Sequence, residues 1–229
     1  MIAPNLIWIL SISFFGLVSL TLVSFILFSL IKKSDLSIFR NFPYEFANKG
    51  NQELAIYRPF LYVLCIAAFT PLFFITPLSA EFGDFAFLTI FVTCVFGLAT
   101  IANMLLFFFD ARYTKTHMVL VTVSMCLSLL SNGLTTLLGV LLFKNYHDRG
   151  VTYLPSLIIA ILAFVFVLAV LVLIFNPKLT KWAKLETNKD SNGEVTVSRG
   201  KIFILAFSEW LTIFLTTLGE LLFFLVLIK

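Results

Sequence analysis

Six long apolar segments constrain this chain more than any other feature. Each runs for about 20 residues or more, the length that an α-helix needs to cross a hydrocarbon core of about 30 Å. They cover residues 6–31, 59–78, 85–109, 118–143, 153–175 and 202–228. The segments lack the two-residue alternation of barrel strands, and a helix satisfies every backbone polar group within lipid. The sequence therefore predicts an all-α fold: one integral membrane bundle of six transmembrane helices over residues 1–229.

The composition excludes several other classes of protein. Hydrophobic residues make up 60% of the chain and charged residues 12%, and the mean hydropathy is +1.04. A soluble domain carries about 25% charged residues, so an ordinary globular protein, a disordered chain and a nucleic-acid binder are all excluded. The partner that this composition predicts is the lipid bilayer.

The basic residues fall on alternate connections between the apolar segments. Thirteen of the 16 Lys and Arg residues lie in the first, third and fifth connections. Because basic loops stay in the cytoplasm, this asymmetry predicts cytoplasmic loops at 32–58 and 176–201 and both termini outside. The sequence contains no Asn-x-Ser/Thr glycosylation site. We therefore expect a multi-pass protein of the cell membrane, and the missing site fits a bacterial plasma membrane.

The two long loops have different compositions. Residues 34–57 mix aromatic with charged side chains, a mixture that suits the lipid headgroup layer and predicts an interfacial hairpin in preference to a binding motif. Residues 177–200 are polar, with a turn cluster at 190–193 followed by the extended-type residues Val195, Thr196 and Val197.

The reactive groups of an enzyme are scarce. His117 and His147 are the two histidines, and we expect them at opposite membrane faces, which excludes a paired haem or zinc site. The cysteines at 65, 94 and 126 form no metal-binding or disulfide pattern. Phosphate-loop, HExxH and GxSxG motifs are absent. The sequence predicts no cofactor, metal or catalytic residue, and it favours a protein without enzymatic activity, although an enzyme without a familiar motif stays open.

Polar residues recur every three or four positions on the third, fourth and sixth segments, so each of these helices has a polar face. The fifth segment is wholly apolar from Leu157 to Phe175 and is expected to face lipid, whereas the first, third, fourth and sixth are expected to face one another. The residues that we expect to line a substrate or ion path are Glu220, Glu209, Thr216, Thr212, Asn132, Ser128, Asn103 and Thr100. Close helix packing through small residues and hydroxyls is the alternative explanation of these faces.

Two glutamates in the last segment are the strongest candidates. Glu209 and Glu220 share one helix face and lie about 16 Å apart along the axis, too far to share a proton. Glu209 adjoins Trp210, an interface-type aromatic, so its carboxylate is expected to reach the headgroups. Glu220 has no comparable route to the headgroups and is therefore the first candidate for a functional polar site. We expect Thr216 as its hydrogen-bond partner and Asn132 at a similar depth. Pro71, inside the second segment, predicts a kink that could serve as a hinge.

These features lead to two function hypotheses. The first is a solute or ion transport component with a polar path lined by the third, fourth and sixth segments. The alternative is a non-catalytic structural or assembly subunit that packs against a larger membrane complex. The protein partners that we consider are other membrane subunits or further copies of this chain. The connections run long then short in the first half and short then long in the second. No inverted repeat of the kind common in transporters is therefore visible, which favours the subunit.

Overall fold

The structure is a computed structural model. It describes residues 36–46, 85–109, 114–150, 154–176, 186–189, 195–198 and 202–226, together with scattered positions between Gly16 and Ile31. The second expected span, 59–78, lies outside the described residues, and so does Pro71. The described positions between 16 and 31 are helical.

Four long helices make up most of the described chain. They are α5 (Ala86–Leu105), α6 (Thr114–Asp148), α7 (Leu154–Ile174) and α8 (Ile204–Val226). All four are long and apolar enough to cross a membrane, and they correspond to the third to sixth segments of the sequence. The expected bundle of membrane helices is therefore present, while the count of six spans and the side of each terminus stay predictions.

The helix ends follow local chemistry. Helix α6 ends at Asp148, and two residues later comes Gly150, whose φ of 77° only glycine adopts readily. Its N–H donates to the carbonyl of His147 at 2.9 Å. Helix α7 ends shortly before Asn176, which precedes Pro177 and is therefore disfavoured in helical geometry. Helix α6 extends several residues beyond the expected span 118–143 at both ends, because polar residues continue the helix past the apolar segment.

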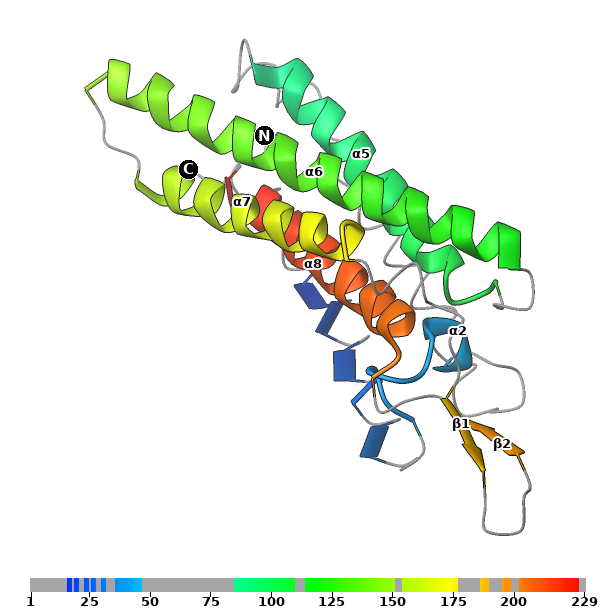
Figure 1. Cartoon of the computed structure of the whole chain (residues 1–229). Helices are drawn as coiled ribbons and strands as arrows, with labels where there is room; N and C mark the ends of the chain where they lie inside the picture. The colour runs from blue at the N-terminus through cyan, green and yellow to red at the C-terminus, as the bar shows by residue number, and fades with distance from the viewer. Residues whose placement is uncertain are drawn as a thin grey trace.

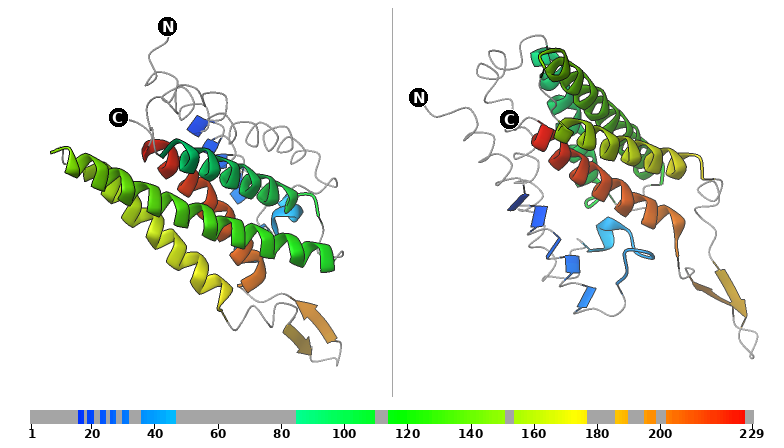
Figure 2. Two further views of the ribbon diagram at one scale, coloured as in Figure 1. Left: turned by 90° about the horizontal axis from the view of Figure 1, so that it is seen from above. Right: turned by 90° about the vertical axis from the view of Figure 1, so that its left-hand side faces the viewer.

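Helix α6 is central in the bundle. It lies between α5 and α7, and α8 packs against all three of these helices (Figures 1 and 2). Large apolar side chains that are fully buried fill the interior, among them Phe96, Leu106, Leu138, Phe223 and Phe224. The interior is thus close-packed between helices that the sequence makes apolar.

Helix α7 presents most of its apolar side chains outward. Ile161, Val165 and Val172 are each at least half exposed, as expected for a wholly apolar helix that faces lipid. Its inner side packs closely on α6, where a Cβ added at Gly139 would lie 2.9 Å from the backbone oxygen of Ser156. This contact brings the two backbones together in the way that small residues allow in membrane helices.

The first segment was expected in the inner group, but its described positions are mostly exposed. Leu17, Leu20 and Ile31 are exposed, while Ser19 and Ile26 are buried. Among the described residues, the polar inner helices are therefore α5, α6 and α8.

Two short elements accompany the bundle at the end where α8 begins (Figure 1). Helix α2 (Pro43–Phe46) belongs to the first long loop. Strands β1 (Glu186–Lys189) and β2 (Val195–Ser198) pair antiparallel, with Glu186 opposite Ser198 and Lys189 opposite Val195. The extended residues expected after the turn cluster thus form β2, so a small β-hairpin adds strands to the otherwise helical fold.

Candidate functional site

The interior of the bundle contains a continuous band of buried polar side chains from α5, α6 and α8. All eight residues expected along a path are part of this band and are at most 6% exposed. Others in the band include Thr89, Thr93, His117, Ser124, Ser131, Thr135 and Ser208. Helix periodicity alone therefore located the polar interior correctly.

Most hydroxyl groups in this band bond to their own helix. Thr212 donates to the carbonyl of Ser208 at 2.8 Å, and Thr216 donates to the carbonyl of Thr212 at 2.8 Å. Their hydrogens are thus used locally, four residues back, as is common for Ser and Thr in helices. The expectation that Thr216 donates to Glu220 is wrong for this reason.

Three polar contacts join the inner helices in pairs. Asn103 on α5 accepts a hydrogen bond from Ser124 on α6. The other two contacts are Thr100 on α5 with Glu220 on α8, and His117 on α6 with Glu209 on α8. Both intramembrane glutamates therefore take part in a contact between helices.

Glu220 lies deep in the bundle, with 1% of its surface exposed. Its Oε2 accepts a hydrogen bond of 3.1 Å from the hydroxyl of Thr100. Its Oε1 is buried without a hydrogen-bond partner among the described residues. A carboxyl group with one unsatisfied oxygen is thus held inside the polar band.

Asn132 lies at the same depth as Glu220, as expected. Its side chain contacts Gly219, the residue before Glu220, so closely that a Cβ at this glycine would overlap it. The Asn132 amide donates to the carbonyl of Ser128 at 2.8 Å. Its Oδ1 and the hydroxyl oxygen of Ser128 have no partner in the described part of the chain. We call Thr100, Ser128, Asn132 and Glu220 the Glu220 cluster. Three of its buried oxygens, Ser128 Oγ, Asn132 Oδ1 and Glu220 Oε1, have no hydrogen-bond partner among the residues that the structure describes.

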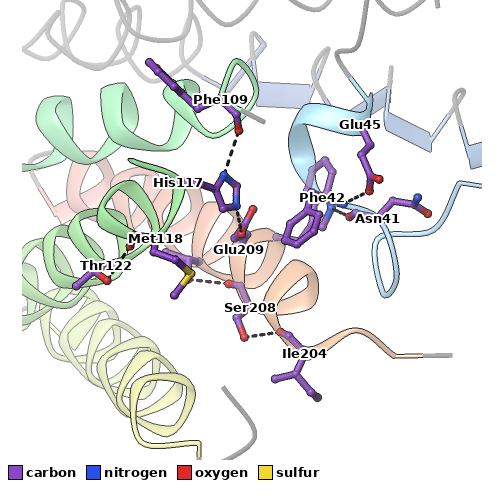
Figure 3. Close-up of polar contacts among 12 residues, drawn as sticks. Asn41, Phe42, Glu45, Phe109, His117, Met118, Thr122, Ile204, Ser208 and Glu209 are labelled. Carbon is purple, nitrogen blue, oxygen red and sulfur yellow. Dashed lines mark hydrogen bonds and ion pairs between the residues drawn. The ribbon is translucent and has the colours of Figure 1, made fainter. Parts of the chain in front are cut away.

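The second glutamate forms a hydrogen-bonded pair with a histidine (Figure 3). His117 Nε2 lies 2.8 Å from Glu209 Oε1, and both side chains are at most 1% exposed. His117 Nδ1 lies 3.0 Å from the carbonyl oxygen of Phe109. Because a carbonyl can only accept, Nδ1 carries a hydrogen, and the proton of the His117–Glu209 bond resides on either Nε2 or Oε1. We call these two residues the His117–Glu209 pair.

Residues 36–46, here called the cover segment, lie against this pair (Figure 3). The rings of Phe42 and Tyr44 meet the His117 ring edge-on, with centroids 5.4 Å and 5.9 Å away. Two hydrogen bonds hold the segment on α8: Trp210 Nε1 donates to the Asn41 carbonyl at 2.8 Å, and Phe203 N donates to the Phe39 carbonyl at 2.7 Å. The described part of the first loop therefore closes one end of the polar band.

These contacts correct three expectations. Glu209 is fully buried and bonded to His117, so its carboxylate does not reach the headgroups. Trp210 is also buried, in edge contact with Phe46, and is not an interfacial anchor. The described part of the loop predicted as an interfacial hairpin buries Phe42 and Phe46 in the bundle instead, while Phe39 stays exposed. The surface around the start of α8 is apolar there and offers hydrogen-bond donors from Phe203 and Trp210.

Sequence reasoning missed His117 and the cover segment. It assigned His117 to a membrane face, but α6 begins at Thr114 and directs this first-turn histidine toward α8. The available signal was the presence of two acids within the apolar segments and two histidines close to segment ends. A pairing between them was open to prediction.

The chemistry available to this arrangement is the binding of protons or small cations. Among the residues that the structure describes, no group of three or more His, Cys, Asp or Glu side chains could hold a metal ion. The site offers carboxyl, amide and hydroxyl oxygens and one imidazole, all enclosed by helices.

The comparisons with known proteins identify no relative. No protein-family model, curated protein or solved structure matches this chain.

Proposed function

We propose that this membrane protein is a solute or ion transport component of a cell membrane, with the polar band of α5, α6 and α8 as its path. A bacterial plasma membrane is the location that the sequence favours. The observation that carries the proposal is Glu220, a buried carboxyl group whose Oε1 has no partner among the described residues.

Packing alone does not require such a group. A charged residue costs roughly 3 kcal/mol at the centre of a membrane helix on insertion scales and less toward its ends, so ionisable residues within membrane helices usually have a function. Small residues and hydroxyls would hold the helices together at lower cost, and the bundle already has them at Gly139 and Ser124.

The cluster around Glu220 indicates the class of solute. Its unpartnered groups are a carboxyl oxygen, the amide oxygen of Asn132 and the hydroxyl of Ser128. Oxygen ligands of this kind suit a hard cation, and the carboxyl group can equally take a proton. We therefore propose a proton or a small cation as the transported or coupling species.

The test is a flux measurement on purified protein in liposomes. An imposed proton or sodium gradient should drive flux through the wild-type protein, and Glu220→Gln, which keeps the shape, should lower that flux at least tenfold. Thr217→Val is the matched control, because the Thr217 hydroxyl bonds only to the Ile213 carbonyl of its own helix. Unchanged flux in correctly folded Glu220→Gln between pH 5 and 8 would show that the ionisable role is wrong.

The alternative, a structural or assembly subunit, is favoured by one observation. The three polar contacts join α5, α6 and α8 pairwise, which is what a stabilising network would do. Purification in mild detergent separates the two functions. A stoichiometric membrane partner together with no flux supports the subunit, whereas flux from the protein alone, or from a homo-oligomer, supports transport.

A further inference from the structure

We propose that the His117–Glu209 pair is a proton-binding site that the cover segment shields from the adjoining aqueous phase. The inference extends the proposed transport function by naming the proton as a coupling ion. Proton binding itself stands or fails separately from transport.

The hydrogen-bond geometry fixes what the pair can do. The Phe109 carbonyl holds a hydrogen on Nδ1, so His117 presents Nε2 to Glu209 Oε1 at 2.8 Å. With one proton in this bond the pair is neutral overall, either as imidazole with carboxylic acid or as imidazolium with carboxylate. Uptake of a second proton gives imidazolium with carboxylic acid, and release of the first gives imidazole with carboxylate.

The hydrogen bonds around Glu209 differ from those expected for a permanent salt bridge. A buried ion pair is favourable only when further hydrogen bonds satisfy the remaining lone pairs. The second carboxyl oxygen of Glu209 is buried and has no partner among the described residues. This oxygen is the natural place for an additional proton, and the half-satisfied carboxyl group fits a site that changes its proton content.

The cover segment decides how a proton reaches the pair. Phe42, at 2% exposure, and Tyr44 lie over the imidazole, so no solvent contact exists on that side while they stay in place. Displacement of the segment requires rupture of the Trp210–Asn41 bond and loss of the aromatic contacts. We therefore expect proton exchange at His117 to be limited by opening of residues 36–46.

The charged groups around the pair are few in the described chain. Helix α2 brings Glu45, whose carboxylate accepts the Phe42 N–H at 2.7 Å. Arg40 precedes that helix, and Lys115 lies two residues before His117 on α6; both are exposed. The described part of α5 contains no charged residue, and the other acid of α8 is Glu220, about 16 Å away.

The chain offers a direct experiment, because it contains two histidines. In protein labelled with ¹⁵N-histidine and placed in lipid nanodiscs, the substitution His147→Gln removes the second histidine, so the remaining signal belongs to His117. We expect Nδ1 to carry a proton throughout and the Nε2 shift to change in a titration between about pH 4 and 10. Glu209→Gln should move the midpoint of this change by at least one pH unit. Phe42→Ala should speed exchange of the ring protons with water.

Each outcome decides one point. A constant Nε2 shift over the whole titration, or the same midpoint in Glu209→Gln, overturns the proton site. A titration in a protein that shows no flux in liposomes keeps the proton site and overturns the proposed transport function. Flux in liposomes from a protein whose His117 does not titrate overturns the proton site and keeps the proposed transport function. His147, exposed at the other end of α6, is the matched control: His147→Gln should leave flux unchanged, whereas His117→Gln should lower it.

Discussion

Gly219 is the residue on which the contact between α6 and α8 depends most directly. The side chain of Asn132 occupies the space where a Cβ at this position would be. In a helix interior, glycine normally costs about 1 kcal/mol relative to alanine, so its presence here needs a packing reason. The reason is the approach of the Asn132 amide to the α8 backbone beside Glu220, which assembles the Glu220 cluster.

We therefore expect Gly219→Ala to destabilise the bundle by about 1–3 kcal/mol, the usual cost of overpacking. Unfolding in detergent measures the change. Gly133→Ala is the control, since nothing lies within 4 Å of a Cβ added at Gly133. The double variant Gly219→Ala with Asn132→Ala should recover part of the loss. A Gly219→Ala protein as stable as the wild type would mean that the Asn132 side chain does not need this space.

At the scale of elements, the cover segment shows how a loop becomes part of the bundle. Glu45 accepts a hydrogen bond from the backbone N–H of Phe42, an arrangement that starts α2 in the manner of a capping box. Phe42 and Phe46 are then buried, and the ring of Phe42 meets that of Phe203 edge-on at 5.4 Å. The segment is thus attached by local capping and by contacts with α8 at the same time.

The attachment through Trp210 can be tested alone. Trp210→Phe keeps an aromatic ring but removes the N–H that donates to the Asn41 carbonyl, which should cost about 1 kcal/mol. We expect the amide hydrogens of residues 36–46 to exchange roughly five times faster, as measured by mass spectrometry. Leu218→Ala, an exposed position on the same helix, serves as the control. Unchanged exchange in Trp210→Phe would mean that the ring contacts and the Phe203–Phe39 hydrogen bond hold the segment without the Trp210 bond.

At the scale of the whole molecule, the polar elements gather at one end. The cover segment, the first turn of α6 and the start of α8 meet there through the contacts of His117, Phe203 and Trp210. The hairpin of β1 and β2 lies at the same end (Figures 1 and 2). This is the end that the basic residues predict to be cytoplasmic, and Asn145 lies near the opposite end of α6.

The orientation can be tested by cysteine labelling after replacement of the three native cysteines. Cysteines at positions 79 and 145, introduced as Ser79→Cys and Asn145→Cys, should react with an impermeant thiol reagent added to intact cells. Ser191→Cys should not react, because it belongs to the basic loop between α7 and α8. Labelling of Ser191→Cys alone would invert the topology. Labelling at all three positions would show that the number of spans is wrong.

The sequence by itself determined the four described membrane helices and the polar faces of three of them. This was possible because a helix in lipid forms its hydrogen bonds locally, so an apolar segment of sufficient length specifies it. The period of 3.6 residues then placed Thr100, Asn132 and Glu220 in the interior without knowledge of the neighbours. The hairpin strand after the turn cluster was readable for the same reason, since turn chemistry is local.

Only the tertiary structure decided which polar atoms meet. Glu220 accepts a hydrogen bond from Thr100 on another helix, because the hydroxyl of Thr216 already donates to the Thr212 carbonyl. Glu209 is hydrogen-bonded to His117, which is 92 residues away in the chain. Such choices depend on the rotation and depth of one helix against another, and these are set by packing across the whole bundle. The cover segment belongs to the same class, because its burial comes from the surface of α8 and not from its own composition.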